Sequence, residues 1–161
     1  MARSYITIGI PGAGKSTYTK TLNAKVISSD AIRGELFGDE GCQDNPKKVF
    51  AILNSRVRKS LLDGEDVIYD ATNVTKKARR TIINTYKNIA DEIIACYFDT
   101  PVEVAKIRNA NRTRVVPDEI IDNMYKKLTV PEFEEGFSEI IYIKTSNDGQ
   151  TTITSKINDA L

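Results

Sequence analysis

The strongest constraint on the fold is the run GIPGAGKS at residues 9–16, which matches the pattern G-x-x-x-x-G-K-[ST] at every required position. A short β-rich run, residues 5–8, precedes it directly, and a plausible helix over residues 15–24 follows it. Glycines in such a loop let successive backbone N–H groups face an anion, and the helix adds the positive end of its dipole. The motif therefore predicts a strand–loop–helix unit that binds the phosphates of a nucleotide.

The residue types of this loop predict separate roles. Lys15 is expected to bridge the β- and γ-phosphates of ATP, and the Ser16 hydroxyl to hold Mg²⁺. A glycine turn without a ligand is the alternative. Together with two arginines from a later segment, the residues expected to contact ATP are Gly9, Pro11, Gly12, Ala13, Gly14, Lys15, Ser16, Thr17, Arg108 and Arg112.

Length and charge narrow the class of protein. The 161 residues predict one compact domain, residues 1–161, with the ordinary composition of a soluble globular protein: 40% hydrophobic and 28% charged residues. A net charge of +1 argues against a protein that coats long nucleic acid, but it is compatible with recognition of a single strand end. Apolar runs are too short to span a bilayer and no secretory leader is evident, so we expect a cytoplasmic protein.

The chemistry available to the chain is limited by what it lacks. Cys42 and Cys96 show no metal-like spacing, which predicts free thiols in a reducing compartment. The sequence has no histidine, so any general base must be a carboxylate or a lysine.

Short apolar runs alternate with longer helical patterns along the chain. This alternation predicts an α/β fold with a parallel sheet of about five strands and helices on both faces. The tail predicts a hairpin around the Asp-Gly turn at residues 147–149. The expected strands are 4–9, 25–29, 66–70, 92–98 and 139–143, and the expected helices are 15–24, 31–37, 46–63, 76–90, 101–111 and 117–128.

Two aspartates follow predicted strands. Ligands of an open α/β sheet bind beyond the carboxyl ends of the strands, where Asp30 and Asp70 are expected. Arg33 comes three residues after Asp30, so both side chains can face one cleft. We assign Asp30 as the general base for an attacking hydroxyl and Asp70 as a Walker-B-like residue that contacts Mg²⁺ directly or through water. An exchange of these roles, or simple capping of a helix or turn by either residue, stays open.

Three arginines, Arg108, Arg112 and Arg114, lie within seven residues that have little apolar content, and this pattern indicates a mobile flap. Charge that develops on a transferred phosphoryl group can be stabilised by arginine. Arg112 is the first candidate for that contact, and Arg108 and Arg114 are supporting lid residues. A solvated helix end is the alternative. Arg79 and Arg80 are compatible with surface positions and are not placed in the site.

Taken together, these elements resemble the 5′-kinase domain of the polynucleotide kinases, both the bacteriophage enzymes and the kinase half of the animal end-repair enzyme. The likeness covers roughly residues 4–143 and includes a P-x-x-x-E-G-F stretch at 131–137. Its ordered elements are G-x-P-G-x-G-K-S at 9–16, D-x-x-R at 30–33, D-x-T-N at 70–73, R-x-x-x-R at 108–112, and Val116-Pro117 at the start of the next helix.

The resemblance implies a P-loop NTPase fold of the adenylate-kinase type with a small arginine lid. It implies transfer of the ATP γ-phosphoryl to the 5′-hydroxyl end of DNA or RNA, with Lys15, Asp30 and Arg112 as catalytic residues and Mg²⁺ held by Ser16 and Asp70. Arg33 would contact the scissile end of the acceptor or its 3′ phosphate. The residues implied to bind the acceptor are Asp30, Arg33, Asp70, Thr72 and Asn73.

The departures from this family matter as well. The phage enzymes carry a phosphatase domain with a D-x-D-x-T motif, which residues 147–151 lack, so we expect a single kinase domain without phosphatase activity. Related enzymes often assemble, so a homo-oligomer is possible. Small P-loop kinases with the same motifs act on other hydroxyls, and a nucleoside, a sugar nucleotide or an aminoacyl-tRNA is the alternative acceptor. A nucleotide-dependent switch without transfer chemistry is a third hypothesis.

Overall fold

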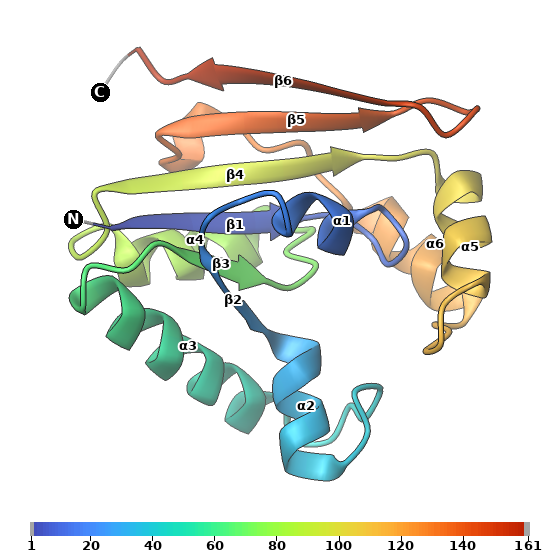
Figure 1. Cartoon of the computed structure of the whole chain (residues 1–161), viewed down its shortest axis with the longest axis horizontal. Helices are drawn as coiled ribbons and strands as arrows, with labels where there is room; N and C mark the ends of the chain where they lie inside the picture. Colours follow the sequence, from blue (N-terminus) through green and yellow to red (C-terminus); the bar gives the residue numbers. More distant parts are fainter. Residues whose placement is uncertain (1, 160–161) are drawn as a thin grey trace.

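In the computed structural model, which describes residues 2–159, six strands form one sheet with the order β2-β3-β1-β4-β5-β6 (Figure 1). The first five strands pair in parallel, and β6 pairs antiparallel with β5. This confirms the α/β class, the parallel sheet and the hairpin at its end. The strands are β1 Arg3–Ile8, β2 Lys25–Ser28, β3 Val67–Asp70, β4 Glu92–Asp99, β5 Glu139–Thr145 and β6 Thr151–Ile157.

The helices also follow the predicted order, but α1 ends five residues and α4 four residues earlier than expected. They are α1 Lys15–Thr19, α2 Ser29–Phe37, α3 Pro46–Leu62, α4 Lys76–Tyr86, α5 Val102–Ala110 and α6 Asp118–Lys127, followed by the 3₁₀ turn η1 Phe133–Glu135. Helix α1 ends early because Thr21 turns the chain: its amide and its hydroxyl both donate to the Tyr18 carbonyl. Helix α4 stops before residue 90 because the chain turns there toward β4, and the Asp91 amide donates to the Ala2 carbonyl.

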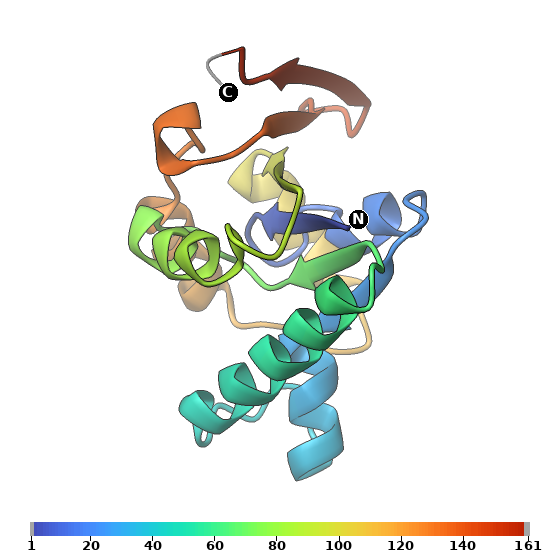
Figure 2. The ribbon, with the colours of Figure 1, turned by 90° about the vertical axis from the view of Figure 1, so that its left-hand side faces the viewer.

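Helices lie on both sides of the sheet, as Figure 2 shows, but they cover it unevenly. One apolar cluster joins α3 and α4 to β1, β3 and β4 on one face, and Leu53 and Tyr86 are fully buried in it. A second cluster joins α5 and α6 to β4 and β5. On that face Tyr18 of α1 packs edge-on against Phe98, with ring centroids 5.9 Å apart. Strand β6 is exposed along its whole length.

Parallel pairing brings the functional loops together. Strand β1 lies between β3 and β4, and β3 pairs with β2, so the chain leaves all three of β1, β2 and β3 at the same edge of the sheet. The loop after β1, the start of α2 and the connection after β3 therefore meet. Both cysteines are free, with Cys42 half-buried and Cys96 buried. Within residues 2–159, no helix is long and apolar enough to cross a membrane.

Candidate active site

The phosphate loop at residues 9–16 closes against its neighbours in a conformation that only glycine permits at two positions. Gly14 has φ +95° and caps α1, and Gly12 has φ +83°. A Cβ on Gly12 would lie 2.1 Å from the Ala105 carbonyl oxygen, so no other residue fits there. The loop is anchored at both ends: the Gly9 amide donates to the Thr72 carbonyl at 3.0 Å, and the Thr100 hydroxyl donates to the Ala13 carbonyl at 3.0 Å.

The Lys15 ammonium lies inside this loop. Its Nζ donates to the Gly9 carbonyl at 2.8 Å and to the Ile10 carbonyl at 3.5 Å. Burial lowers the pKa of Lys15 to about 8, and the nearby carboxylates of Asp70 and Asp30 oppose this shift. A bound phosphate would stabilise the charged form of this lysine, because its oxygens would replace the water contacts that burial removed.

Asp30 stands in the first turn of α2 and does not cap the helix. Ser28 is the cap, and its hydroxyl accepts from the Ala31 amide. The Asp30 carboxylate is therefore available to the cleft, and each of its oxygens meets a guanidinium group. Arg33 donates to Oδ1 at 3.0 Å, and Arg114 donates to Oδ2 at 3.0 Å.

Asp70 ends β3 and is held by a residue that the sequence analysis missed. The Thr7 hydroxyl lies 3.3 Å from Asp70 Oδ1, and it also donates to the Ala71 carbonyl at 2.7 Å. Burial raises the pKa of Asp70, and the Lys15 charge opposes this rise. A polar side chain between the apolar residues Ile6 and Ile8, just before the phosphate loop, was the available signal for Thr7.

Ser16 and Asp70 are the residues that could hold Mg²⁺. Both line the same cavity, and a carboxylate disfavoured by burial is stabilised by a cation. Mg²⁺ usually takes one or two protein oxygens and completes its shell with water and substrate phosphates, so this donor set fits the ion. Among residues 2–159, no cluster of three or more His, Cys, Asp or Glu side chains forms a protein-only metal cage.

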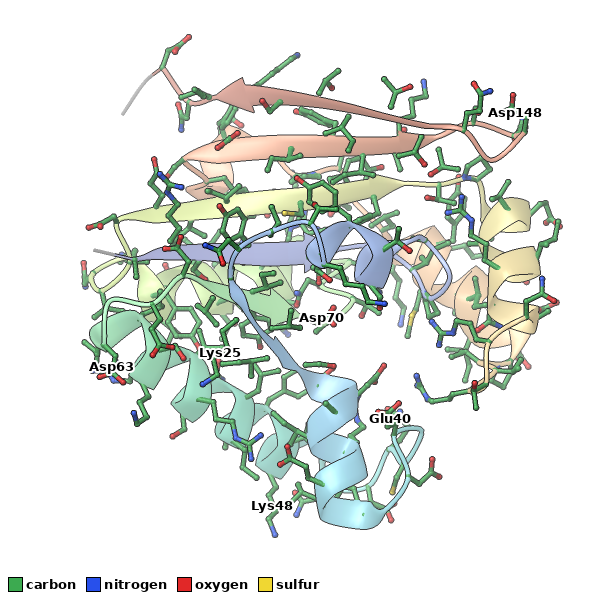
Figure 3. The ribbon with its side chains drawn as sticks, in the orientation of Figure 1. Lys25, Glu40, Lys48, Asp63, Asp70 and Asp148 are labelled. Atoms are coloured by element: carbon green, nitrogen blue, oxygen red, sulfur yellow. The ribbon has the colours of Figure 1, made fainter. Side chains whose placement is uncertain are left out.

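A cavity of about 530 Å³ joins these groups. Figure 3 labels Asp70 at the end of β3 and Glu40 on the α2–α3 connection, and residues of both elements line the cavity. Its lining contains both charged or polar and apolar side chains. The charged and polar lining includes Lys15, Ser16, Asp30, Arg33, Asp39, Gln43, Asp70, Thr72, Arg112 and Arg114; the apolar lining includes Pro11, Phe50, Val115, Val116, Pro117, Ile120 and Met124.

A second cavity of about 370 Å³ lies on the other side of the loop, against the β5–β6 hairpin. Arg108 lines this cavity and not the larger one, and its guanidinium reaches the Gly149 carbonyl of the hairpin turn at 3.5 Å. The remaining lining residues are Ala13, Gly14, Thr17, Tyr18, Thr21, Ile143, Thr145, Thr151 and Ile153.

Most of the predicted site residues thus line one of two cavities that share the phosphate loop. Arg112 lines the larger cavity, and its Nε donates to the Arg114 carbonyl at 3.3 Å. Gly9 and Gly12 belong to the loop backbone between them. Asn73 lines neither cavity: it is buried with φ +47°, and its amide donates to the Thr7 carbonyl at 2.9 Å. Its side chain therefore braces β1 and does not face an acceptor.

Arg79 is fully buried, which corrects the expectation that it could be a surface residue. Its guanidinium donates to both carboxylate oxygens of Glu135, at 2.9 and 3.2 Å. It also donates to the Asn73 and Val74 carbonyls, each at 3.1 Å, and to the Thr129 hydroxyl at 2.9 Å. Arg79 thereby ties the loop after Asp70 to the segment that contains the P-x-x-x-E-G-F motif.

Two further parts of the cavity wall were missed by the sequence analysis. The α2–α3 connection contributes Asp39, Gly41 and Gln43. The segment before α6 contributes Val115 and the first turn of α6 contributes Ile120, which are 56% and 42% exposed. In the sequence Val115 directly precedes the Val116-Pro117 pair that opens the next predicted helix, and that position was the signal for the second.

Known proteins resemble this chain in sequence and in fold. The chain is 29% identical over 136 residues to an L-seryl-tRNA(Sec) kinase of Methanococcus maripaludis, across 78% of this chain and 52% of that protein. It is 26% identical, with a TM-score of 0.61, to a chain of the Pnkp1/Rnl/Hen1 complex, across 71% of this chain and 41% of that one. A gluconokinase from Sinorhizobium meliloti shares the fold, with a TM-score of 0.59 and 17% identity across 88% and 81% of the two chains.

The chain therefore spans about half of the length of the tRNA kinase that it matches, and less than half of the matched chain of the complex. A family model described as an AAA domain matches residues 5–131, which is most of the chain and includes the phosphate loop, both aspartates and the arginine segment. The chain belongs to this AAA domain family and has the α/β fold of the P-loop kinases.

Proposed function

We propose that this protein is an ATP-dependent kinase that transfers the γ-phosphoryl group to the 5′-hydroxyl end of a nucleic acid. The observation that carries the proposal is the shared cavity: the Lys15 ammonium in the phosphate loop and the Asp30 carboxylate line one space of about 530 Å³. A donor's terminal phosphate and an acceptor's hydroxyl can meet there, with a proton acceptor beside them.

The two cavities suggest where each substrate binds. The loop amides and Lys15 would hold the phosphates of ATP, and its base would lie in the smaller cavity beside Arg108 and the hairpin. The acceptor would enter the larger cavity from the side of the α2–α3 connection. Its hydroxyl would approach Asp30, and its base or sugar would contact the apolar wall that includes Val115 and Ile120.

In the proposed reaction, the acceptor oxygen forms a bond to the γ-phosphorus as the bond from that phosphorus to the β,γ-bridging oxygen breaks, and ADP leaves. Asp30 takes the proton that the hydroxyl gives up. Lys15 and Arg112 hold the negative charge of the transferring group. Mg²⁺, held by Ser16 and Asp70, would neutralise phosphate charge and keep the donor in place.

The two relatives with 29% and 26% sequence identity support a nucleic acid acceptor. The name of the first includes a tRNA, and the second belongs to a complex that contains Pnkp1. The seryl hydroxyl of a charged tRNA is the second candidate, because the relative with 29% identity is named for that acceptor. In both cases the acceptor hydroxyl would be carried by a nucleic acid.

The test is transfer of label from ATP labelled in the γ-phosphate. The acceptor panel contains 5′-OH RNA and DNA oligonucleotides, the same oligonucleotides with a 5′ phosphate, seryl-tRNA and gluconate. The proposal expects product with 5′-OH ends and none with blocked ends. Product with seryl-tRNA alone would favour the second candidate, and a protein that binds ATP but labels no 5′-OH end would refute the first.

A further inference from the structure

The Asp30 carboxylate is engaged from two elements that lie far apart in the sequence. Arg33 reaches one oxygen from the next turn of α2, and Arg114 reaches the other from a segment 84 residues away. If Asp30 is the proton acceptor of the proposed function, an incoming hydroxyl must share or replace one of these partners. Either Arg33 or Arg114 must then move away from the Asp30 carboxylate.

Arg33 is the fixed partner. Its side chain is 10% exposed, and its guanidinium carbon lies 5.7 Å from the centre of the Phe50 ring. Its Nε is buried and has no hydrogen-bond partner among residues 2–159. A buried guanidinium with an unused donor at the lining of a cavity is a site prepared for an anion.

Arg114 is the exchangeable partner. It lies between α5 and α6 in a segment without regular structure, and its side chain is 27% exposed. The Asp30 pair is the one hydrogen bond that its side chain makes within the described part of the chain. No packed ring or second acceptor therefore holds Arg114 in place.

We propose that Arg114 is a specificity residue that exchanges partners. Without acceptor it pairs with Asp30 across the larger cavity; when an acceptor with a phosphate ester beside its reactive hydroxyl enters, Arg114 leaves Asp30 and binds that phosphate together with Arg33. An acceptor without the phosphate must break the same pair and receives nothing in return. The inference rests on the proposed function only in taking Asp30 as the residue that the hydroxyl approaches.

The charges of the cavity support this exchange. Its lining holds four cationic side chains, Lys15, Arg33, Arg112 and Arg114, against the carboxylates of Asp30, Asp39 and Asp70. If ATP occupies Lys15 and Arg112, two guanidinium groups remain beside the acceptor. That number matches one phosphate ester and exceeds the needs of a neutral hydroxyl compound.

The first experiment compares kcat/KM for thymidine 3′-phosphate, the dinucleotide TpT and thymidine, which differ in the phosphate beside the sugar. We expect Arg114→Ala to reduce the preference for the phosphorylated acceptors over thymidine about tenfold to a hundredfold, the range of a hydrogen bond between charged groups. Arg80→Ala, which changes an exposed arginine that does not line the cavity, should leave the preference unchanged. An unchanged preference in Arg114→Ala would overturn the inference.

A binding experiment separates this inference from the kinase proposal. Thymidine 3′-phosphate is titrated calorimetrically into protein saturated with ADP and Mg²⁺, so that the phosphate loop is occupied. Arg114→Ala should weaken binding about tenfold or more. Asp30→Asn should tighten it about two- to fivefold, because it releases Arg114 from a partly exposed ion pair. In the double variant the gain from Asp30→Asn should vanish.

The outcomes are distinct. If the wild-type protein binds thymidine 3′-phosphate in this pattern but transfers no phosphoryl group, the kinase proposal fails and the role of Arg114 stands. If Asp30→Asn leaves the affinity unchanged or lowers it, or if the wild-type protein does not bind the probe, the exchange of partners is wrong.

Discussion

Replacing Arg79 should damage both the stability of the protein and the site, although Arg79 touches neither cavity. The side chain is fully buried, and its ion pair with Glu135 is nearly so, with the two side chains 0% and 10% exposed. Removing one partner of a buried pair costs about 3–5 kcal/mol, because the other charge is left without compensation. For a chain of this size, that loss corresponds to a fall in Tm of roughly 6–20 °C.

The assay is urea unfolding followed by far-UV circular dichroism, since the chain has no tryptophan. Arg80→Ala is the matched control: the neighbouring residue is exposed, and its loss should change the free energy of unfolding by no more than about 0.5 kcal/mol. If Arg79→Ala costs less than about 1 kcal/mol, the pair does not support the fold as the buried-pair argument requires.

A second variant separates the charge from the other contacts. In Arg79→Met with Glu135→Leu, both charges are gone, so the unpaired carboxylate no longer contributes. We expect this double variant to recover only part of the lost stability, because the Asn73 and Val74 carbonyls would still lack their donor. These carbonyls follow the loop that begins at Asp70, so phosphoryl transfer should stay impaired. Full recovery of both stability and transfer would show that the ion pair alone matters.

Three further predictions concern the cavity. Asp30→Asn should lower phosphoryl transfer by about 10²–10⁴-fold through loss of the proton acceptor, with ADP affinity unchanged by calorimetry; undiminished transfer would remove Asp30 from the mechanism. Burial lowers the pKa of Lys15 to about 8, so in the free protein Lys15 loses its charge above pH 8, whereas bound phosphates keep it protonated. The affinity for ADP should therefore fall by at most about tenfold per pH unit above pH 8, and binding at pH 9 should take up a proton. Calorimetry in buffers of different ionisation enthalpy measures that uptake, and its absence would contradict the lowered pKa. Gly12→Ala should abolish ADP binding, because its Cβ would lie 2.1 Å from the Ala105 carbonyl oxygen; wild-type affinity would mean that the loop can rearrange.

Local patterns were enough to predict most of the fold. The five parallel strands were predicted to within two residues, because each is a short apolar run followed by a helix or loop. The same patterns placed Asp30 and Asp70 at strand ends. Because β2 and β3 pair in parallel, those ends lie at the same edge of the sheet. The boundaries of α1 and α4 were less predictable, since they depend on hydrogen bonds made by the turns that follow.

Interactions between residues far apart in the chain could not be predicted from the sequence. Helical periodicity puts Arg79 on the apolar face of α4 with Ile82 and Ile83, but its partner Glu135 lies 56 residues away, so the sequence does not predict their ion pair. Likewise, Arg114 was predicted as a supporting lid residue, but its pairing with Asp30 depends on how α5 and α6 fold back over the sheet. The bracing role of Asn73 was hidden as well, because a D-x-T-N motif does not say which of its polar side chains faces the cavity.

The end of the sheet has a consequence for how such a protein could diversify. The hairpin of β5 and β6 supplies Ile143, Thr145, Thr151 and Ile153 to the smaller cavity and no residue to the lining of the larger one. Under the proposed function, separate stretches of the chain would therefore determine the preference for the nucleotide donor and the preference for the acceptor. Selection could then change one preference without changing the other and without altering the phosphate-binding loop that both cavities share.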